Sequence, residues 1–417
     1  MKPASQRQGS PVPRRFVARS GTHPSAIRSG AEVTNRCRLA EWQLSRRSLL
    51  GAAAAAVATI ANIRASSSAN IRASAGTSAL SSSRLPRWRG FNLTELFDPA
   101  SPGPHQFQKF DFDAIAEWGF DFVRLPSSYW FWASPQPARW LDINDDVLAR
   151  TVDTAIAMGR SRGIHVNLCL HRAPGYCANP PAEALSLWSD EAALEAAAHH
   201  WTHLAKRYRS IPSTDLSFNL INEPPDTISV EQYLRVHRRL HAAVREVDAK
   251  RLVIVDAMNF ATDPVLALAG EGVAISMHAY KPAELSLYHA SWLDADGAGS
   301  WPVPDWPLKI EDPPNDVGLW DRDRLRREEI VPFAMMQQRQ VGVHIGEWGV
   351  YQNTPHDVAL RWMSDQLDLW REAGWGWALW NLRGPFGVID SGRTDVKYEA
   401  FRGHLLDRQM LEVLRAG

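Results

Sequence analysis

Cysteine is scarce in this chain, which has three cysteines among 417 residues. Such a low count excludes a small scaffold held together by a dense set of disulfides. No Cys-x-x-Cys pair occurs, so the spacing of a cysteine-ligated metal site is also missing. Cys37 lies in the N-terminal segment, whereas Cys169 and Cys177 flank the end of one predicted strand. The spacing of that pair fits a disulfide and two buried thiols equally well.

The chain also has no net charge, because it carries 46 basic and 46 acidic residues. The two kinds of charge are, however, unevenly distributed along the chain. Residues 1–85 hold 13 Lys or Arg and 2 Asp or Glu, so the other 332 residues hold 33 basic and 44 acidic groups. An acidic body argues against nucleic acid as a partner, because phosphate binding needs clustered lysine and arginine. The basic segment is typical of an export or tail region joined to a globular body.

A long apolar run is the third feature that the chain lacks, and a membrane span would need about 20 such residues. Arg46 and Arg47 instead precede a short, alanine-rich apolar stretch at 52–60, which is typical of a secretory signal. The arginine pair followed by Leu49 and Leu50 resembles the twin-arginine type. A membrane anchor is the alternative, but the stretch is too short for one. We expect residues 1–65 to direct export to the periplasm or the exterior, with membrane contact only during export.

Residues 66–85 form a low-complexity linker in this interpretation. The hexapeptide Ala-Asn-Ile-Arg-Ala-Ser occurs at 61–66 and again at 69–74, and Ser, Ala and Gly dominate residues 75–83. Such a segment cannot bury enough apolar surface to fold by itself. The globular body is therefore expected to span residues 86–417.

Within the body, short apolar runs alternate with amphipathic stretches. Eight strands, each followed by a helix, predict a closed (β/α)8 barrel, with a long loop after the sixth strand. An open doubly wound sheet is the alternative, but the sequence has no glycine-rich phosphate loop after its first strand. The strands are expected at 88–93, 122–125, 166–170, 216–221, 252–256, 273–277, 343–346 and 377–380, and the helices at 111–118, 145–161, 190–208, 230–247, 264–269, 322–340, 357–373 and 396–414. Gly159, Gly163 and Gly374 are expected to end helices.

Polar side chains gather where these strands end, which is where barrel enzymes carry their chemistry. Glu223 and Glu347 each follow an apolar, strand-like run and precede a residue that breaks a strand. Two carboxyls that face one cleft are the minimum equipment for cutting a glycosidic bond. The other polar strand-end residues are Asn92, Glu95, Arg124, His171, Asn222, His278, Tyr280, Trp380 and Asn381.

Seven motifs in this order resemble glycoside hydrolase family 5, the family of retaining β-glycosidases that contains many cellulases. They are Val-Arg-Leu-Pro at 123–126, Leu-His-Arg-Ala-Pro-Gly at 170–175, Leu-Ile-Asn-Glu-Pro at 220–224, His-Ala-Tyr at 278–280, Ile-Gly-Glu-Trp at 345–348, Trp-Ala-Leu-Trp at 377–380 and Gly-Pro-Phe-Gly-Val-Ile-Asp at 384–390. The resemblance implies a retaining double displacement, with Glu223 as the acid/base and Glu347 as the nucleophile.

The supporting residues have chemistry that suits such a site. Arg124 and Tyr280 can keep Glu347 ionised by charge and by a hydrogen bond. Asn222 can hold a sugar hydroxyl, and His171 and His278 can donate to hydroxyls or orient the glutamates. Tryptophan presents a flat apolar face to a sugar ring, and the chain has 18 of them. We expect Trp380 to form the floor of the site and Trp130, Trp132, Trp301 and Trp306 to line the groove.

The function expected from these residues is a secreted endo-β-1,4-glucanase that acts on polysaccharide as a monomer. A β-mannanase, a xyloglucanase or an exo-β-glucosidase on the same scaffold remains an alternative, because loops choose the sugar. An inactive carbohydrate-binding barrel is a remote one. No cofactor is expected, since two carboxyls and water suffice. A helical pair, His199 and His203, has metal-ligand spacing but lies on the outer helix ring, so no metal site is expected there.

Overall fold

The computed structural model describes residues 80–417, apart from 102, 294–300 and 312–316. The predicted export signal lies outside the described residues. The last part of the predicted linker is described and is packed against the body: the Ser82 carbonyl accepts a hydrogen bond of 2.7 Å from the Gly342 amide, and Leu85 is buried. The packed chain therefore begins before residue 86.

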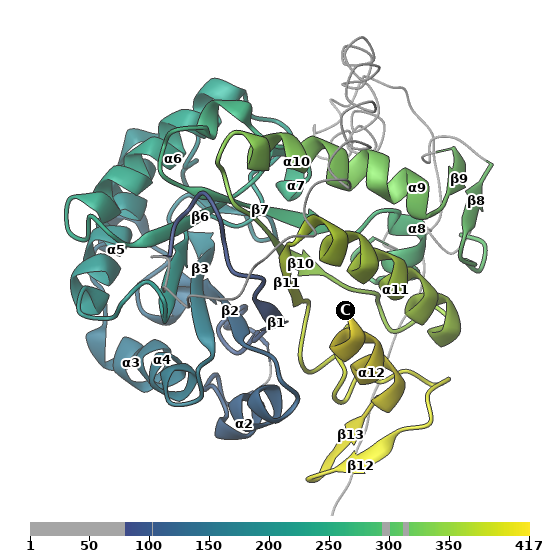
Figure 1. The fold of residues 1–417 in the computed structure, drawn as a ribbon. Helices are drawn as coiled ribbons and strands as arrows, with labels where there is room; N and C mark the ends of the chain where they lie inside the picture. Colours follow the sequence, from purple (N-terminus) through teal and green to yellow (C-terminus); the bar gives the residue numbers. More distant parts are fainter. Residues whose placement is uncertain (1–79, 102, 294–300, 312–316) are drawn as a thin grey trace, which may run out of the picture. The chain divides into compact units, whose positions relative to one another are not determined.

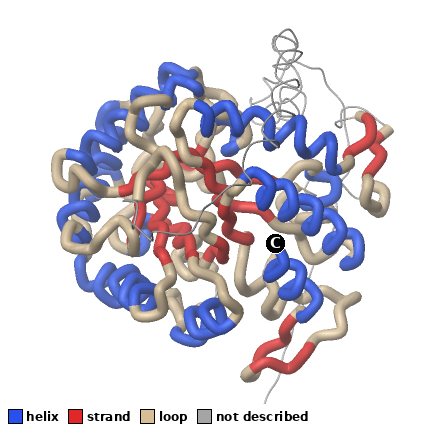
Figure 2. Tube along the Cα trace, in the orientation of Figure 1, coloured by secondary structure: helices blue, strands red, loops and turns tan. Residues whose placement is uncertain are grey.

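Eight parallel strands form a closed barrel in the middle of the ribbon, and helices surround it (Figures 1 and 2). The (β/α)8 prediction is confirmed. Almost every strand residue is buried, because a parallel barrel is covered by helices outside and by packed side chains inside. The barrel strands are β1 (Arg89–Asn92), β2 (Phe122–Ser128), β3 (His165–Ala173), β5 (Leu216–Asn219), β6 (Leu252–Asp256), β7 (Ala274–Ala279), β10 (Val343–Trp348) and β11 (Gly376–Leu379).

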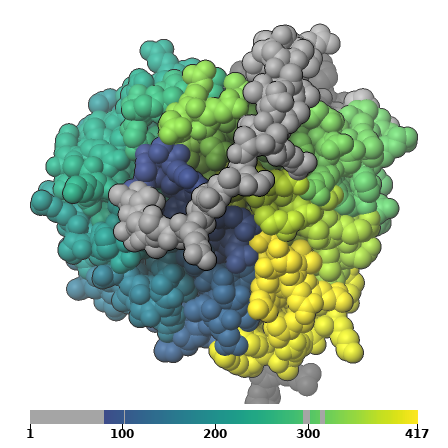
Figure 3. All heavy atoms as spheres, viewed as in Figure 1, coloured from purple at the N-terminus to yellow at the C-terminus, as the bar shows by residue number. Residues whose placement is uncertain are grey.

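Closure of the barrel depends on β1, which pairs with β2 on one side and with β11 on the other. Gly90 makes this possible, because a Cβ at this position would lie 1.7 Å from the Phe122 carbonyl oxygen. At the amino end of the barrel, Trp88 stacks on the buried His165 ring at 3.7 Å between centroids. The first and last parts of the body also touch outside the barrel (Figure 3). The Phe110 ring stacks there on the His404 ring.

The outer helices follow the predicted order with local differences. The stretch predicted at 145–161 is broken at Thr151, the one at 264–269 is a single 3-10 turn (Leu266–Leu268), and a π-helical turn (Arg326–Ile330) joins α9 to α10. The helices are α2 (Lys109–Glu117), α3 (Asp145–Arg150), α4 (Val152–Arg160), α5 (Glu191–Tyr208), α6 (Val230–Arg245), α7 (Met258–Ala261), α8 (Ala283–Ser286), α9 (Arg322–Leu325), α10 (Val331–Gln338), α11 (His356–Ala373) and α12 (Arg408–Ala416). None of the helices in the described ranges is long and apolar enough to cross a bilayer.

The helix predicted at 396–414 is wrong in its first half. Residues there form a hairpin of β12 (Glu399–Phe401) and β13 (His404–Leu406), and α12 begins only after it. The two residues of the turn, Arg402 and Gly403, both have positive φ, the conformation that a tight two-residue hairpin requires. Asp407 then starts the helix by accepting the Met410 amide at 3.0 Å.

Two further hairpins lie outside the ring of eight barrel strands. The short strand β4 (Tyr176–Cys177) folds back on the end of β3, and β8 (Leu308–Ile310) pairs with β9 (Gly318–Trp320) in the long region after β7.

Gly163 and Gly374 follow helices with positive φ, as predicted, but Gly159 lies inside α4. A Cβ at Gly159 would lie 2.7 Å from the Val166 side chain, so this glycine allows α4 to pack closely on β3.

Candidate active site

The two predicted glutamates meet at the carboxyl end of the barrel. Glu347 belongs to β10, and Glu223 follows β5, three strands away in the ring. A carboxylate oxygen of Glu223, one of Glu347 and a ring nitrogen of His278 all lie within 4.8 Å of one another. Glu347 is buried, whereas the Glu223 side chain keeps 19% of its surface exposed. One carboxyl is therefore enclosed and the other opens towards solvent.

The backbone holds Glu223 in an unusual conformation. Its φ is +47°, a left-handed value that costs free energy for a residue with a Cβ. Contacts on both sides compensate: the Glu223 amide donates to Asp256 at 3.0 Å, and the Tyr176 hydroxyl donates to the Glu223 carbonyl. Pro224 follows, and its carbonyl accepts from the Phe260 amide at 2.9 Å. The carboxyl is thus aimed by three neighbouring segments of the chain.

Three side chains contact the Glu347 carboxylate. Arg124 donates from Nη1 at 2.6 Å, the Tyr280 hydroxyl donates at 3.3 Å, and His278 Nδ1 lies 3.6 Å away. Burial raises the pKa of Glu347 to about 7, although the positive charges of His278 and Arg124 act in the opposite direction. The expected placement of Arg124 and Tyr280 against Glu347 is what the structure shows, but burial outweighs their effect on its ionisation.

Arg124 joins the strand ends into one network. Besides Glu347, its guanidinium reaches Asn92 at 3.1 Å, Asn219 at 3.0 Å and Asn222 at 2.7 Å, all through side-chain oxygens. The arginine is fully buried, so each of these acceptors offsets part of its desolvation. Asn222 therefore faces Arg124 through its oxygen, while its buried Nδ2 finds no protein acceptor and remains a donor for a ligand.

His278 bridges the acidic groups. Its Nδ1 lies 2.8 Å from Glu223 Oε1, and its Nε2 lies 3.3 Å from Asp256 Oδ2. Burial disfavours the charged ring, but Glu347 and Asp256 outweigh this effect and raise the pKa of His278 to about 10. Burial also opposes ionisation of Asp256, yet His278 and Arg124 hold its pKa below the usual range. A pKa raised to this value favours the protonated ring at neutral pH, and the ring lies between three acidic side chains.

Asp256 and Asn219 were missed as site residues by sequence reasoning. Asp256 ends a predicted strand and is the acidic residue of that buried run, which is the signal that could have identified it. Asn219 lies inside β5 and connects Arg124 to Asp256, with a hydrogen bond of 3.0 Å to the aspartate. Both act behind the two glutamates and not at the surface of the cleft, because they are fully buried.

An aromatic floor adjoins the glutamates. Trp380 stacks on His171 at 5.8 Å between centroids, and Phe97 packs edge-on against both rings. His171 Nε2 pairs with Asn179 at 2.9 Å, while its buried Nδ1 has no protein partner. Asn381 donates to the Thr94 hydroxyl at 3.5 Å. The expected positions of Trp380 and His171 beside the site are therefore what the structure shows.

The four tryptophans expected to line the groove fall into a half-buried pair and a buried pair. Trp130 is half-buried at the end of β2, with the Arg172 guanidinium 4.2 Å from its ring centroid, and Trp301 is also half-buried. The prediction that Trp132 and Trp306 line the groove is wrong. Both are buried in the core and donate their indole N–H to His200 and Asp365, respectively. Loops that carry them fold back onto the helices, so neither ring offers a face to a sugar.

The remaining predictions concern thiols and metals. Cys169 and Cys177 are free thiols, so the alternative without a disulfide holds, and Cys169 lies 3.1 Å from Arg124. Glu223, His278 and Glu347 together have the donor types of a metal site. The Arg124 guanidinium at 2.6 Å from Glu347 already supplies the positive charge that a metal ion would bring.

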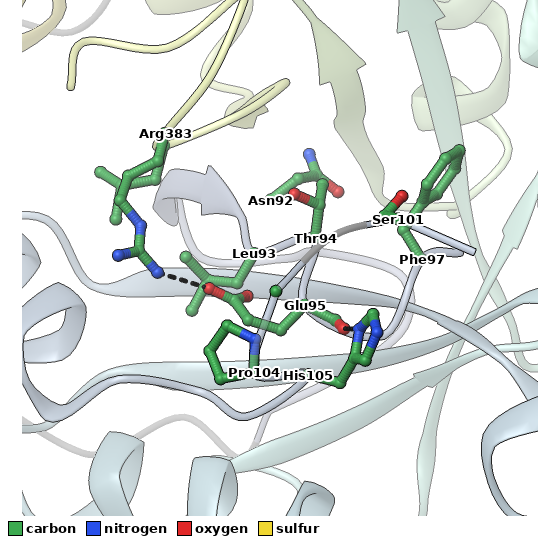
Figure 4. Close-up of a pocket in the computed structure, with 11 residues that line it drawn as sticks. Asn92, Leu93, Thr94, Glu95, Phe97, Ser101, Pro104, His105 and Arg383 are labelled. Atoms are coloured by element: carbon green, nitrogen blue, oxygen red, sulfur yellow. Dashed lines mark hydrogen bonds and ion pairs between the residues drawn. The ribbon is translucent and has the colours of Figure 1, made fainter. Parts of the chain in front are cut away.

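A cavity of about 240 Å³ opens beside the aromatic floor (Figure 4). Asn92, at the end of β1, and Thr94, Glu95 and Phe97, from the loop that follows, form one wall, and Arg383, from the loop after β11, faces them. Arg383 Nη2 pairs with Glu95 Oε1 at 2.8 Å. The cavity shares Asn92 with the Arg124 network and Phe97 with the floor, so it is continuous with the site.

Comparison with known proteins agrees with this geometry. Residues 82–384 match the model of the cellulase family, glycosyl hydrolase family 5. The solved structure of a glycoside hydrolase is 36% identical, with a TM-score of 0.73, and the match covers 79% of this chain and 99% of that one.

Curated relatives are more distant. Endoglucanase C of Acetivibrio thermocellus is 24% identical over 310 residues, which cover 69% of this chain and 88% of the relative. A probable glucan 1,3-beta-glucosidase A of Aspergillus fumigatus is 27% identical over 220 residues, half of each chain. With the barrel, the paired carboxyls and the family model in agreement, the chain belongs to glycoside hydrolase family 5 and is a glycosyl hydrolase.

Proposed function

We propose that the protein cleaves β-glycosidic bonds in a polysaccharide with retention of configuration, with Glu347 as nucleophile and Glu223 as acid/base. The observation that carries the proposal is the approach of the two carboxyls, whose oxygens lie within 4.8 Å. Retaining enzymes hold their carboxyls about 5–5.5 Å apart, whereas inverting enzymes leave about 6.5–9.5 Å for a water molecule. The measured approach favours direct attack by a carboxylate.

The environments of the two glutamates support this division of roles. Glu347 is enclosed by Arg124, Tyr280 and His278, so that one of its oxygens can be directed at a sugar carbon. Glu223 is the more exposed carboxyl, which suits a group that must exchange its proton with a leaving sugar and then with water.

The reaction proceeds in two steps. In the first, Glu347 forms a bond to the anomeric carbon while the bond from this carbon to the leaving oxygen breaks, and Glu223 gives its proton to that oxygen. In the second step, Glu223 takes a proton from a water molecule, and the water oxygen bonds to the anomeric carbon. The bond between this carbon and Glu347 breaks, which releases the Glu347 carboxylate. His278 Nδ1 lies 2.8 Å from Glu223 and 3.6 Å from Glu347, so the ring is placed to stabilise either carboxyl when it is negatively charged.

The preferred substrate in this proposal is a β-1,4-glucan cut at internal bonds. The name of the Acetivibrio relative, an endoglucanase, supports this choice. An exo-acting β-glucosidase is the second candidate, and the name of the Aspergillus relative favours it over half of the chain. Product sizing on carboxymethylcellulose, laminarin, mannan and xyloglucan tests both. Early oligosaccharides from carboxymethylcellulose are expected, and release of glucose alone would favour the exo-acting enzyme.

Retention and the two roles are tested together. Proton NMR of freshly formed product is expected to show the β-anomer first, and the α-anomer first would contradict retention. Glu347→Gln should abolish turnover, and Glu223→Ala should slow aryl glycosides with poor leaving groups most, because these need protonation. Glu399→Gln is the matched control, since it removes an exposed carboxyl paired with Arg408 at 2.7 Å and should leave activity unchanged.

Export is part of the proposal, and the twin-arginine-type pattern in residues 1–65 supports it. Fractionation of cells that express the full chain is expected to place activity outside the cytoplasm. Lysine in place of both Arg46 and Arg47 should retain it in the cytoplasm, whereas the same change at Arg14 and Arg15 should not. Activity that stays in the cytoplasm with the natural sequence would contradict export.

A further inference from the structure

A buried acid that the two-step mechanism does not use lies on the outer ring of helices. Glu329 belongs to the π-helical turn Arg326–Ile330 and is only 4% exposed. Such turns often occur at functional positions in proteins. Among the described residues, none forms an ion pair with Glu329, and the Lys281 Nζ lies 3.9 Å from Glu328 instead. An ionised carboxylate in this place would carry an uncompensated desolvation cost.

One hydrogen bond joins Glu329 to α11, and the atoms beside it imply a second. Gln366 donates from Nε2 to Glu329 Oε2 at 2.9 Å. The other oxygen of each group, Glu329 Oε1 and Gln366 Oε1, is buried and has no hydrogen-bond partner among the described residues. Two acceptors cannot bond to each other, but one proton on Glu329 Oε1 would satisfy both. The acid and the amide would then exchange two hydrogen bonds in a closed ring.

The electrostatic surroundings favour this proton. Burial raises the pKa of Glu329 from 4.5 to about 7, and the negative charge of Glu328 on the same turn acts in the same direction. The hydrogen bond from Gln366 and the positive charge and backbone amide of Lys281 act against burial without overcoming it. In the described part of the chain, Lys281 and Glu328 are the charged groups whose fields reach the acid, and α11 faces it with a neutral amide.

The same face of α11 holds the segment that carries Tyr280. Trp362, one helical turn before the amide partner of Glu329, donates its indole N–H to the Lys281 carbonyl at 3.1 Å. The Lys281 backbone amide lies close enough to Glu329 to affect its pKa. Lys281 directly follows Tyr280, whose hydroxyl donates to Glu347 at 3.3 Å. The buried acid and the proposed nucleophile are therefore linked through two consecutive residues.

We propose that Glu329 is a positioning residue that works as a neutral acid, because its proton completes a pair with Gln366 that fastens the π-helical turn and α11 around Lys281 and so keeps Tyr280 on Glu347. The part that concerns Tyr280 rests on the proposed hydrolase function. Loss of the proton leaves a buried charge between the turn and α11 and weakens this support. The support is therefore complete in acid and declines as the pH rises.

Unfolding at several pH values tests the proton. Glu329→Gln mimics the neutral acid, since its amide can exchange two hydrogen bonds with Gln366 at any pH. The native state holds the Glu329 proton up to about pH 7, whereas the unfolded chain releases it near 4.5. Between these values, the unfolding equilibrium constant of the natural protein, divided by that of Glu329→Gln, should rise about tenfold per pH unit, and it should level off above 7.

A ratio that does not change with pH would refute the buried proton. Glu328→Gln is the matched control, because it removes the neighbouring acid of the same turn, whose side chain is 23% exposed. The ratio of the natural protein to Glu328→Gln should not show this rise. The infrared difference spectrum between the natural protein and Glu329→Gln at pH 6 should contain the C=O band of a protonated carboxylic acid, and its absence would also refute the proton.

An exchange of the two groups tests the pair. At pH 7, Gln366→Glu alone places two acids against each other and should raise the unfolding equilibrium constant by about tenfold or more. Adding Glu329→Gln restores one acid facing one amide and should return the constant to within about threefold of the natural value. An exchanged pair that is no more stable than Gln366→Glu alone would contradict the ring of two hydrogen bonds.

Kinetics test the positioning role. Glu329→Ala should lower kcat for an aryl β-cellobioside by about tenfold with little change in KM, as expected for loss of the Tyr280 hydrogen bond to a charged group, whereas Glu329→Gln should keep both values. In a Tyr280→Phe background, Glu329→Ala should cost less than about twofold more, because that bond is already absent. Equal losses in the two backgrounds, or no loss in either, would refute a role through Tyr280.

Hydrogen exchange distinguishes failure of this inference from failure of the proposed function, because it needs no substrate. Deuterium uptake in a peptide covering residues 280–286 should be faster in Glu329→Ala than in the natural protein and in Glu329→Gln. If the natural protein hydrolyses no glycoside but this acceleration is seen, the support stands and only the hydrolase proposal fails. Equal uptake in all three would refute the support. Circular dichroism shows whether each variant is folded, and the exchanged pair decides the question if Glu329→Ala is not.

Discussion

The charge of Glu347 is the property on which the proposed chemistry depends at the scale of single residues. Its carboxylate must attack, yet burial raises its pKa to about 7. His278 and Arg124 lower it from the still higher value that burial alone would give. Glu347, the proposed nucleophile, is therefore kept close to its titration point by opposing effects, and removal of either cation should raise its pKa.

The pH dependence of kcat/KM tests this balance. Because the attacking form is the carboxylate, kcat/KM should fall about tenfold per pH unit below about 7. His278→Asn should move this acid limb to higher pH, since the cation that lowers the pKa of Glu347 is lost. Tryptophan fluorescence at each pH verifies that the fold persists. A rate that stays constant down to pH 5 would contradict the assignment.

Asp256 provides a second test at this scale. It accepts the Glu223 amide and lies 3.3 Å from His278, so Asp256→Asn removes the charge that helps to keep the ring protonated. We expect kcat to fall on the order of tenfold with little change in KM, and the alkaline limb of the profile to move to lower pH. Asp153→Asn, on the outer helices, is the control. A change in KM alone would argue against a positioning role.

The site residues at strand ends could be predicted from the sequence, but those buried behind them could not. Short apolar runs mark these residues, because Glu223, Glu347, His278 and Tyr280 end or follow such a run and Arg124 lies within one. Contacts such as that between Asn219 and Asp256 depend on which strands are neighbours and at what height their side chains point, and this is set only when the barrel closes. Loop tryptophans carry no such pattern, which is why Trp132 was misplaced.

The hairpin formed by the end of β3 and β4 stands out among the elements around the site. Arg172, at its base, pairs with Glu183 at 2.8 Å, and both side chains are at least 94% buried. The Tyr129 hydroxyl also donates to Glu183, at 2.7 Å, so the pair ties the loop after β4 to the end of β2. The same arginine lies over the Trp130 ring. One ion pair thereby positions a candidate wall of the groove.

Breaking this pair should be costly. Glu183→Ala leaves a buried guanidinium without its partner and should lower the free energy of unfolding by about 3–5 kcal/mol. Glu195→Ala removes the partner of Arg239 on the surface, where both side chains are more than a third exposed, and should cost less than about 1 kcal/mol. Urea unfolding followed by circular dichroism measures both. Equal costs would show that Glu183 does not fasten the loop.

Element boundaries show where a linear pattern is insufficient. The final predicted helix failed because Arg402 and Gly403 make a hairpin turn, and a residue with positive φ, such as the arginine, leaves no clear mark in the sequence. The long helices α5, α6 and α11 were predicted to within a few residues, because each has a continuous apolar stripe and a clear start or end.

For the whole molecule, the buried charges of the site link stability to pH. His278 has its pKa raised from 6.5 to about 10, so the native state holds the proton more tightly than the unfolded chain does. Its contribution to stability is complete below pH 6.5 and is lost as the pH rises towards 10. Asp256, with a lowered pKa, contributes in the opposite sense and loses its contribution only in acid.

The alkaline side is the more accessible test. The difference in unfolding free energy between the natural protein and His278→Asn should shrink as the pH rises from 6.5 to 10, by an amount on the order of a few kcal/mol. His404→Asn, at a more accessible histidine paired with Asp390, is the control for the loss of a histidine away from the site. A difference that stays constant across this range would mean that the buried ring is neutral.

The barrel itself was the most predictable level. Eight apolar runs separated by amphipathic stretches leave few other arrangements, because a parallel strand needs a crossover helix before the next one. The side pocket with Glu95 and Arg383 could not be predicted in the same way, since it joins loops that are nearly 290 residues apart in the chain.

The place of β1 between β2 and β11 has a consequence for how the protein is made. Hydrogen bonds on one edge of the first strand are supplied by residues near 378, so a nascent chain released earlier exposes that edge to its neighbours. Nearly the entire polypeptide must be synthesised before β11 can pair with β1 and close the barrel. Pairing between strands so far apart in the sequence slows folding. Clones shortened before residue 376 are therefore expected to accumulate as aggregates during expression.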